Sequence, residues 1–133
     1  FMEAVKQLAA EAGLEVPAPS PEARAKAEVA DSLAELTARA AAWFQSQLAS
    51  DSGAGARAYI ELRGLRPATV KAFALGYSPD NRTALRSHLK DATADKLLEA
   101  GLIGKTEQNE TYDRFRGRLM FPIRDARGRV VGF

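Results

Sequence analysis

The sequence has no cysteine and a single histidine among its 133 residues. Without cysteine, disulfides and thiolate metal sites are excluded within these residues, and His88 alone cannot form a metal site. No apolar run approaches the roughly 18 residues that a membrane span needs. Residues 1–14 alternate apolar and charged positions, unlike a signal peptide. We therefore expect a cytoplasmic protein with no membrane contact.

The composition is that of an ordinary globular domain, with 46% apolar and 27% charged residues. A net charge of +2 hides a gradient along the chain. Residues 1–50 hold four basic and seven acidic side chains, whereas residues 112–133 hold six arginines and two aspartates. Arginine is suited to planar, bidentate contact with phosphate. The gradient therefore predicts an anionic partner at the C-terminal end.

Periodicity and breakers predict mostly helices, followed by a terminal hairpin. A proline-rich extended linker is expected over residues 15–21, and Ser20 before Pro21 is typical of a helix start. The expected helices cover residues 1–14, 21–49 (long and amphipathic), 56–62, 67–73, 82–90 and 94–100. A short strand is expected over 74–77, a polar hairpin tip or mobile loop over 105–110, and a hairpin with strands 115–124 and 129–133. The fold class is therefore α+β: several helices with a small C-terminal antiparallel sheet.

The stretch YDRFRGRLMFPIRDARGRVVGF, residues 112–133, carries all six of these arginines. If residues 114–124 form one strand, Arg114, Arg116 and Arg118 share a face with Met120 and Pro122. Phe115, Gly117, Leu119, Phe121 and Ile123 then share the opposite face and pack on the helices. Three guanidinium groups in a row could bind successive phosphates of a nucleic-acid strand. Equally, they could be a solvated edge that prevents strand-to-strand aggregation.

The same stretch resembles the segment ahead of the Toprim catalytic domain in bacterial-type DNA primases. Other parts agree in the same order, namely YIELRGL with LGYSP (59–65 and 75–79), KLLEAGLI (96–103) and the opening FMEAV. The resemblance implies a nucleotidyltransferase that synthesises short RNA primers on single-stranded DNA in the primosome during replication. It also implies that this chain is the N-terminal subdomain of the RNA polymerase core.

In that family a zinc ribbon precedes this subdomain, and Toprim and helicase-binding domains follow it. Residues 1–14 would be the helix after the zinc ribbon, residues 15–50 a linker and long helix, and residues 51–133 the body of the subdomain. Toprim chemistry needs a Glu and an Asp-x-Asp cluster for divalent cations, and the sequence has no Asp-x-Asp. We expect no cofactor within this chain, inactivity of the chain alone, and Mg²⁺ or Mn²⁺ and Zn²⁺ in the whole protein. Phe133 would then be a boundary inside a longer polypeptide.

The resemblance places this subdomain against the single-stranded template, the RNA–DNA hybrid and the ribonucleoside triphosphates, with the helicase engaged elsewhere. The implied phosphate-binding residues are Arg114, Arg116, Arg118, Arg124, Arg127 and Arg129. Arg63 is a weaker candidate, because it could instead compensate the C-terminal charge of a helix. Tyr112 could stack on a base, although it could equally belong to the core. No catalytic or metal-binding residue is assigned.

Two other functions remain open on the sequence. The chain could be a non-catalytic single-strand-binding or replisome adaptor domain of primase ancestry. Alternatively, the arginine face could dock on a protein neighbour. Salt-dependent binding to an oligonucleotide separates nucleic-acid contact from protein docking.

Overall fold

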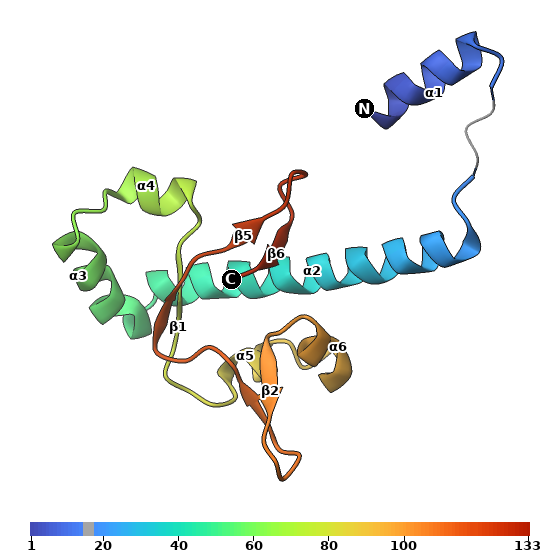
Figure 1. Ribbon diagram of the computed structural model, residues 1–133. Helices are drawn as coiled ribbons and strands as arrows, with labels where there is room; N and C mark the ends of the chain where they lie inside the picture. Colours follow the sequence, from blue (N-terminus) through green and yellow to red (C-terminus); the bar gives the residue numbers. More distant parts are fainter. Residues whose placement is uncertain (15–17) are drawn as a thin grey trace. The chain divides into compact units, whose positions relative to one another are not determined.

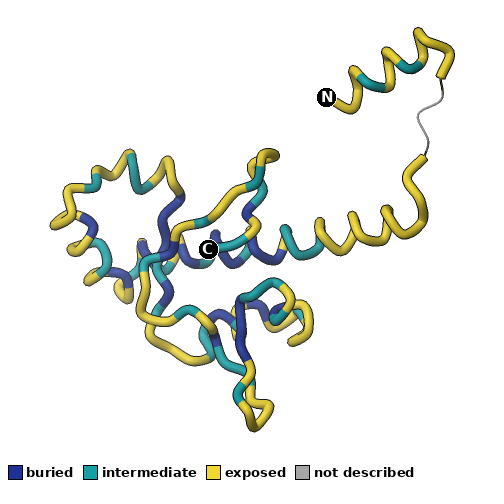
Figure 2. Tube along the Cα trace, viewed as in Figure 1, coloured by how far each residue is buried: buried dark blue, intermediate teal, exposed yellow. Residues whose placement is uncertain are grey.

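Helix α2, Pro21–Ala49, is the longest element of the chain (Figure 1). The Oγ of Ser20 accepts a hydrogen bond from the Ala23 N–H at 3.1 Å, which confirms the predicted helix start. Only the second half of α2 is buried (Figure 2): Leu36, Thr37, Ala40, Ala41, Phe44 and Leu48. The apolar face of this amphipathic helix is therefore covered only in part, since Val29 is 49% exposed.

The computed structural model describes residues 1–14 and 18–133, and the chain divides into two units, Phe1–Ala30 and Asp31–Phe133. Residues 15–17 of the expected linker lie outside the described residues. The first unit contains α1, Met2–Glu11, and the start of α2, and none of its described residues is buried. Its helix α1 ends before Gly13, whose φ of +69° suits a helix stop.

The second unit contains the remaining elements. Its helices are η1 (Asp51–Gly53), α3 (Ala54–Leu62), α4 (Pro67–Ala72), α5 (Ala84–His88) and α6 (Ala94–Glu99). Its strands are β1 (Gly76–Ser78), β2 (Ile103–Lys105), β3 (Thr111–Asp113), β4 (Arg118–Met120), β5 (Ile123–Arg124) and β6 (Val130–Gly132). They form three two-stranded antiparallel sheets, β1–β4, β2–β3 and β5–β6. The predicted α+β class is therefore confirmed.

Two apolar clusters flank α2. The first joins α2 to α5, α6, β2 and β4: Leu36, Ala40, Phe44, Leu85, Leu89, Leu97, Leu102, Ile103 and Met120. The second joins the end of α2 to α3 and to the residue before β1 through Leu48, Ile60 and Leu75. At the edge of the first cluster the half-buried Trp43 ring stacks on His88, with ring centroids 5.7 Å apart. These contacts hold the short elements, which are too short to be stable alone.

The prediction of one continuous strand over residues 115–124 is wrong. Gly117 takes a φ of +57°, a left-handed conformation that interrupts an extended strand. The strand begins after it, as β4, and pairs with β1 so that Arg118 faces Ser78. Arg114 and Arg116 therefore lie in a loop between β3 and β4, which we call the arginine loop (residues 114–117).

The predicted division of faces also fails beyond Leu119. Met120, expected on the arginine face, is only 3% exposed and belongs to the first apolar cluster. Phe121 and Ile123, expected on the packed face, are 54% and 56% exposed. Met120 follows Arg118 by two residues in the same strand, so burial changes along one face of β4: the face is exposed at Arg118 and covered by the first apolar cluster at Met120.

Among residues 1–14 and 18–133, no helix combines the length and the apolar character that crossing a membrane requires.

Candidate nucleic-acid interface

The arginine loop is fixed at its N-terminal end by Asp113, the last residue of β3. This side chain is 1% exposed, and its two oxygens accept the N–H groups of Leu85 at 2.7 Å and Arg86 at 3.1 Å. Both N–H groups belong to the first turn of α5, whose amides have no partner inside the helix. The Arg114 N–H donates to the Leu102 carbonyl at 3.1 Å. These hydrogen bonds fix the direction in which the chain leaves β3.

Phe115 fixes the middle of the loop. Its ring makes edge contacts with Phe44 and Phe133, at centroid distances of 6.4 Å and 5.9 Å. Its carbonyl accepts the hydroxyl of Ser78 at 2.6 Å, and Ser78 is itself 2% exposed. The inward-facing residues of the loop are therefore held by both packing and hydrogen bonds.

The arginines between these anchors face solvent. Arg114, Arg116 and Arg118 are all exposed, as the alternation predicts, although only Arg118 lies in a strand. Among residues 1–14 and 18–133, no hydrogen bond or ion pair involves any of their three guanidinium groups. The backbone is thus fixed while three positive charges stay available to an outside anion.

Burial raises the pKa of the Asp113 carboxyl above its ordinary value. The two backbone N–H groups and the charges of Arg86 and Arg116 oppose that rise. Arg86 is occupied elsewhere, because its guanidinium donates to the carbonyl of Thr111 at 3.2 Å and to the Thr111 hydroxyl. Arg116 forms no ion pair with Asp113 among the described residues, so it lowers the Asp113 pKa through its charge alone.

The second arginine group lies on the β5–β6 hairpin, and its members differ in their contacts. Arg124 is exposed, and its guanidinium donates to the Gly128 carbonyl at 3.3 Å. Arg127 is exposed in the turn and uses only its backbone N–H, which donates to Asp125 at 2.9 Å. Arg129 is half-buried and ion-paired to Asp31 and Asp125.

The structure does not join Arg63 or Tyr112 to these groups. Arg63 caps the C-terminus of α3 and lies over the Tyr59 ring, 5.9 Å from its centroid. Tyr112 is half-buried, and its ring lies so close to Gly104 that a Cβ there would approach the ring to 2.6 Å. One face of the Tyr112 ring is therefore covered by β2.

Sequence reasoning missed the residues that hold the arginines in place. Asp113, Ser78 and Asp31 contact partners between 27 and 98 positions away in the chain. Local periodicity carries no information about such contacts. The sequence does contain one indication of two such residues: Asp113 and Asp125 are the only acids among the six arginines of residues 112–133.

Other features of the second unit do not compete with the arginines as a site. A hollow of about 340 Å³ between α2, α3 and α4 is lined mainly by apolar side chains, including Leu48, Ile60 and Val70. No arginine of residues 112–133 lines it. In residues 1–14 and 18–133 no group of three or more histidine or carboxylate side chains could hold a metal ion. We therefore assign none of the described residues to a metal.

Comparison with known proteins identifies the family. Residues 43–133 match the sequence model described as DNA primase catalytic core, N-terminal domain. The chain is 41% identical to a DNA primase of Deinococcus radiodurans over 136 aligned residues, covering 100% of this chain and 22% of that protein. It spans about a quarter of the length of the curated relatives that it matches.

Solved structures agree. The DnaG primase catalytic domain bound to ssDNA matches with a TM-score of 0.75 and 34% identity, covering 79% of this chain and 34% of that one. The zinc-binding and RNA polymerase domains of the Aquifex aeolicus primase match with a TM-score of 0.65 and 26% identity, covering 97% and 30% of the two chains. By sequence model, relatives and structure, this chain belongs to the family of the N-terminal domain of the DNA primase catalytic core.

Proposed function

We propose that this chain binds the phosphates of single-stranded template DNA within a primase that synthesises short RNA primers. One observation carries the proposal, namely the three exposed guanidinium groups of Arg114, Arg116 and Arg118 on a backbone fixed from behind. Guanidinium groups recognise phosphate by charge and by paired N–H donors. A fixed backbone lowers the conformational entropy lost on binding, because the backbone that carries these arginines is already ordered without DNA.

The chemical contribution of these residues is binding and orientation. Each guanidinium attracts a phosphate oxygen and holds the strand at a defined place along the loop. None of them has a neighbouring base or nucleophile among the described contacts, so we assign no proton transfer to them. Primer synthesis itself, the attack of a ribose 3′-hydroxyl on an α-phosphate, would take place on a neighbouring part of the parent enzyme.

We further propose the organisation of the parent protein that the family resemblance implies. Residues 1–14 would follow a zinc ribbon, residues 15–50 would form the linker and long helix, and residues 51–133 the body of the subdomain. A Toprim domain binding Mg²⁺ or Mn²⁺ and a helicase-binding domain would complete a cytoplasmic replication enzyme. Ribonucleoside triphosphates and the RNA–DNA hybrid would share the surface that the arginines line. The relative from Aquifex aeolicus, whose structure includes a zinc-binding domain, is consistent with this organisation.

The test measures binding of a fluorescent oligodeoxythymidylate to this chain by anisotropy at several salt concentrations. We expect log K to fall linearly with log salt, since each phosphate contact of a single strand contributes a slope of about −0.7. Changing Arg114, Arg116 and Arg118 together to Gln should reduce the magnitude of the slope by about 2. Binding without any salt dependence contradicts the proposal.

A matched control removes the same charge elsewhere. Lys6, Arg24 and Lys26 are exposed basic residues of the first unit, and changing all three to Gln lowers the net charge equally. We expect this variant to keep most of the wild-type slope. Equal losses in the two triple variants would mean that only net charge matters, and the arginine loop would then have no special role.

A further inference from the structure

The apolar attachment of the β5–β6 hairpin lies at β6 and just after it, where Val130 is buried and the Phe133 ring packs against Phe44 at a centroid distance of 5.2 Å. The first strand of the hairpin has two residues, and the register shifts between Ile123 and Arg124. Ile123 and Val131 are 56% and 52% exposed, whereas Val130 is buried at 6%. A two-stranded hairpin is only marginally stable by itself. Polar contacts must therefore contribute to fixing its position.

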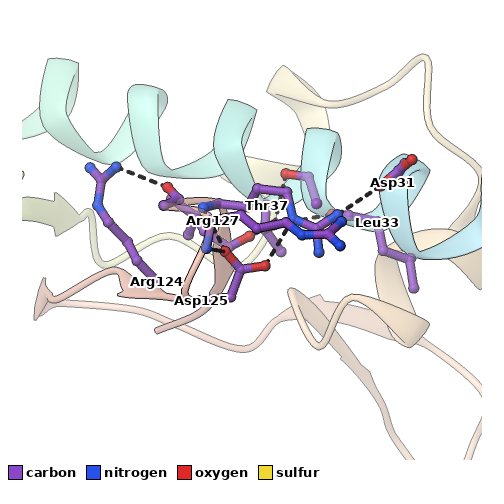
Figure 3. A network of polar contacts seen from close by, with 10 residues as sticks. Asp31, Leu33, Thr37, Arg124, Asp125 and Arg127 are labelled. Atoms are coloured by element: carbon purple, nitrogen blue, oxygen red, sulfur yellow. Dashed lines mark hydrogen bonds and ion pairs between the residues drawn. The ribbon is translucent and has the colours of Figure 1, made fainter. Parts of the chain in front are cut away.

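Asp125 organises the turn of this hairpin (Figure 3). Its Oδ1 accepts the N–H groups of Arg127 and Arg129, both at 2.9 Å. Its Oδ2 accepts Nε of the Arg129 side chain at 2.8 Å. These hydrogen bonds lower the pKa of the Asp125 carboxyl, with the backbone N–H of Arg129 contributing most. The carboxylate thus determines both the shape of the turn and the orientation of the Arg129 side chain.

Arg129 then connects the turn to α2. Its terminal nitrogen donates to Oδ1 of Asp31 at 2.7 Å, while its Nε stays on Asp125. The next residue continues the attachment, because the Val130 carbonyl accepts the buried hydroxyl of Thr37. Asp31 and Thr37 both belong to α2, so two consecutive hairpin residues are fastened to one rigid helix.

The contacts of Arg129 conflict with a phosphate-binding role. Two of its five N–H groups already donate to carboxylates, and the negative charges of Asp31 and Asp125 beside it repel a phosphate. Arg127, in contrast, has an exposed side chain with no hydrogen bond or ion pair to the described residues. Arg124 is exposed and gives one hydrogen bond to a carbonyl oxygen.

We propose that Arg129 is a positioning residue which, with Asp31 and Asp125, fixes the β5–β6 hairpin on α2 so that Arg124 and Arg127 contact DNA phosphates. The proposal rests on the proposed function, since it assumes that this surface binds a nucleic-acid strand. It adds an acidic residue of α2, Asp31, to the groups on which that binding depends.

The direction in which one substitution changes the DNA affinity separates this proposal from an effect of net charge alone. Asp31→Asn removes a negative charge from a protein that binds an anion, so charge alone predicts equal or tighter binding. A positioning role predicts weaker binding, because the hairpin loses its fixed place. Glu28→Gln is the matched control: Glu28 lies on α2 one turn earlier, and no hydrogen bond or ion pair joins it to the described residues.

The experiment repeats the oligodeoxythymidylate titration on the whole 133-residue chain. We expect Asp31→Asn to bind about two- to five-fold more weakly, the range that an exposed ion pair supports. The slope of log K against log salt should lose up to about 1.4, although every arginine is still present. Glu28→Gln should bind as tightly as the wild type or slightly more tightly. Equal or tighter binding by Asp31→Asn overturns the proposal.

Conservative variants give a second, independent readout. Asp31→Glu keeps the carboxylate and should restore most of the affinity. Arg129→Lys keeps the charge but cannot span two carboxylates with a planar fork, so we expect it to resemble Asp31→Asn. Full affinity in Arg129→Lys contradicts the proposal, because a lysine can replace an arginine that contacts phosphate as a point charge. Thermal unfolding of each variant establishes that it is folded at the titration temperature.

Hydrogen exchange without DNA separates failure of this inference from failure of the proposed function. Asp31→Asn should speed exchange of the hairpin amides, residues 123–132, relative to those of the α2 core. If the wild type shows no salt-dependent DNA binding, the proposed function and the phosphate role of Arg124 and Arg127 both fail. Faster exchange would then still support the positioning of the hairpin by Arg129. Unchanged exchange would overturn the positioning as well.

Discussion

The arginine loop and the β5–β6 hairpin both expose arginines, but they are fastened differently. In the loop, the acid Asp113 is buried and binds backbone N–H groups of α5, so no carboxylate pairs with Arg114 or Arg116. In the hairpin, the acid Asp125 binds an arginine side chain, which pairs with a second carboxylate as well. The same residue types therefore leave both arginines of the loop available, whereas in the hairpin Arg129 is ion-paired. The two regions differ in the partner of the neighbouring acid: Asp113 binds backbone N–H groups, whereas Asp125 binds an arginine side chain.

The largest effect is expected from Asp113→Ala in the loop. This change leaves the Leu85 and Arg86 N–H groups without their acceptor, and a buried donor without a partner costs about 1–3 kcal/mol. We expect the free energy of unfolding in urea to fall by about 2–4 kcal/mol. Asp80→Ala, at an exposed turn position, is the control and should change little. A loss below about 0.5 kcal/mol for Asp113→Ala would show that the capping contact is not needed.

Gly117→Ala tests the bend that separates the loop from β4. At a φ of +57° an alanine Cβ costs about 1–2 kcal/mol. Gly117→Asn should cost less, because asparagine tolerates the left-handed region better. Urea unfolding of the two variants compares them directly. Equal stability of the alanine and asparagine variants would argue against a left-handed residue at this position.

Thr37→Val removes the one buried side-chain hydrogen bond from α2 to the hairpin carbonyl of Val130. The valine fills the same space, so the expected loss is that of a single hydrogen bond, about 1 kcal/mol. Thr37→Ser keeps the hydroxyl and should retain most of that stability. Amide exchange by NMR should report the loss at residues 129–131 first. Uniform destabilisation of both apolar clusters would instead indicate a packing defect.

The smallest effect concerns pH, and the two regions should respond with opposite sign. Asp125 has a lowered pKa in the folded chain, so its stabilising contribution is present above the unfolded pKa and lost as pH falls. Asp113 has a raised pKa, so its contribution is greatest below the unfolded pKa and is lost as pH rises through the folded value. Urea unfolding between about pH 3 and pH 6 should show a shallower acid loss in Asp125→Asn. Asp113→Asn should remove the opposing dependence, and an unchanged pH profile in both variants would refute these assignments.

The exposure of Arg114, Arg116 and Arg118 could be predicted from the sequence because extended backbone alternates its side chains whether or not it pairs in a sheet. The residue at which the strand begins could not be predicted, because it depends on the left-handed conformation of Gly117 and on the pairing of β4 with β1. Met120 shares its face of β4 with Arg118 as predicted, but its burial depends on the first apolar cluster, which the local pattern does not reveal. The sequence predicted the start of α2 well, because Ser20 and Pro21 act within one turn.

The supporting contacts of the candidate site lay beyond sequence reasoning. Asp31 meets Arg129 across 98 positions, and nothing in the local pattern of α2 distinguishes Asp31 from Glu28. Only the fold brings the helix and the hairpin together. The sequence identifies all the candidate arginines of residues 112–133, but which of them stay available to a ligand depends on the neighbours that the fold gives them.

The stacking of Trp43 on His88 has a practical consequence. Trp43 is the only tryptophan of the chain, and its ring rests where α2 meets α5. Its emission therefore comes from one place, the edge of the cluster to which Asp113 fastens the arginine loop. Unfolding of the second unit separates indole from imidazole and exposes the ring to water, so intrinsic fluorescence can follow it without a label. The first unit contributes no tryptophan emission, and melting of α1 would pass unseen in the same signal.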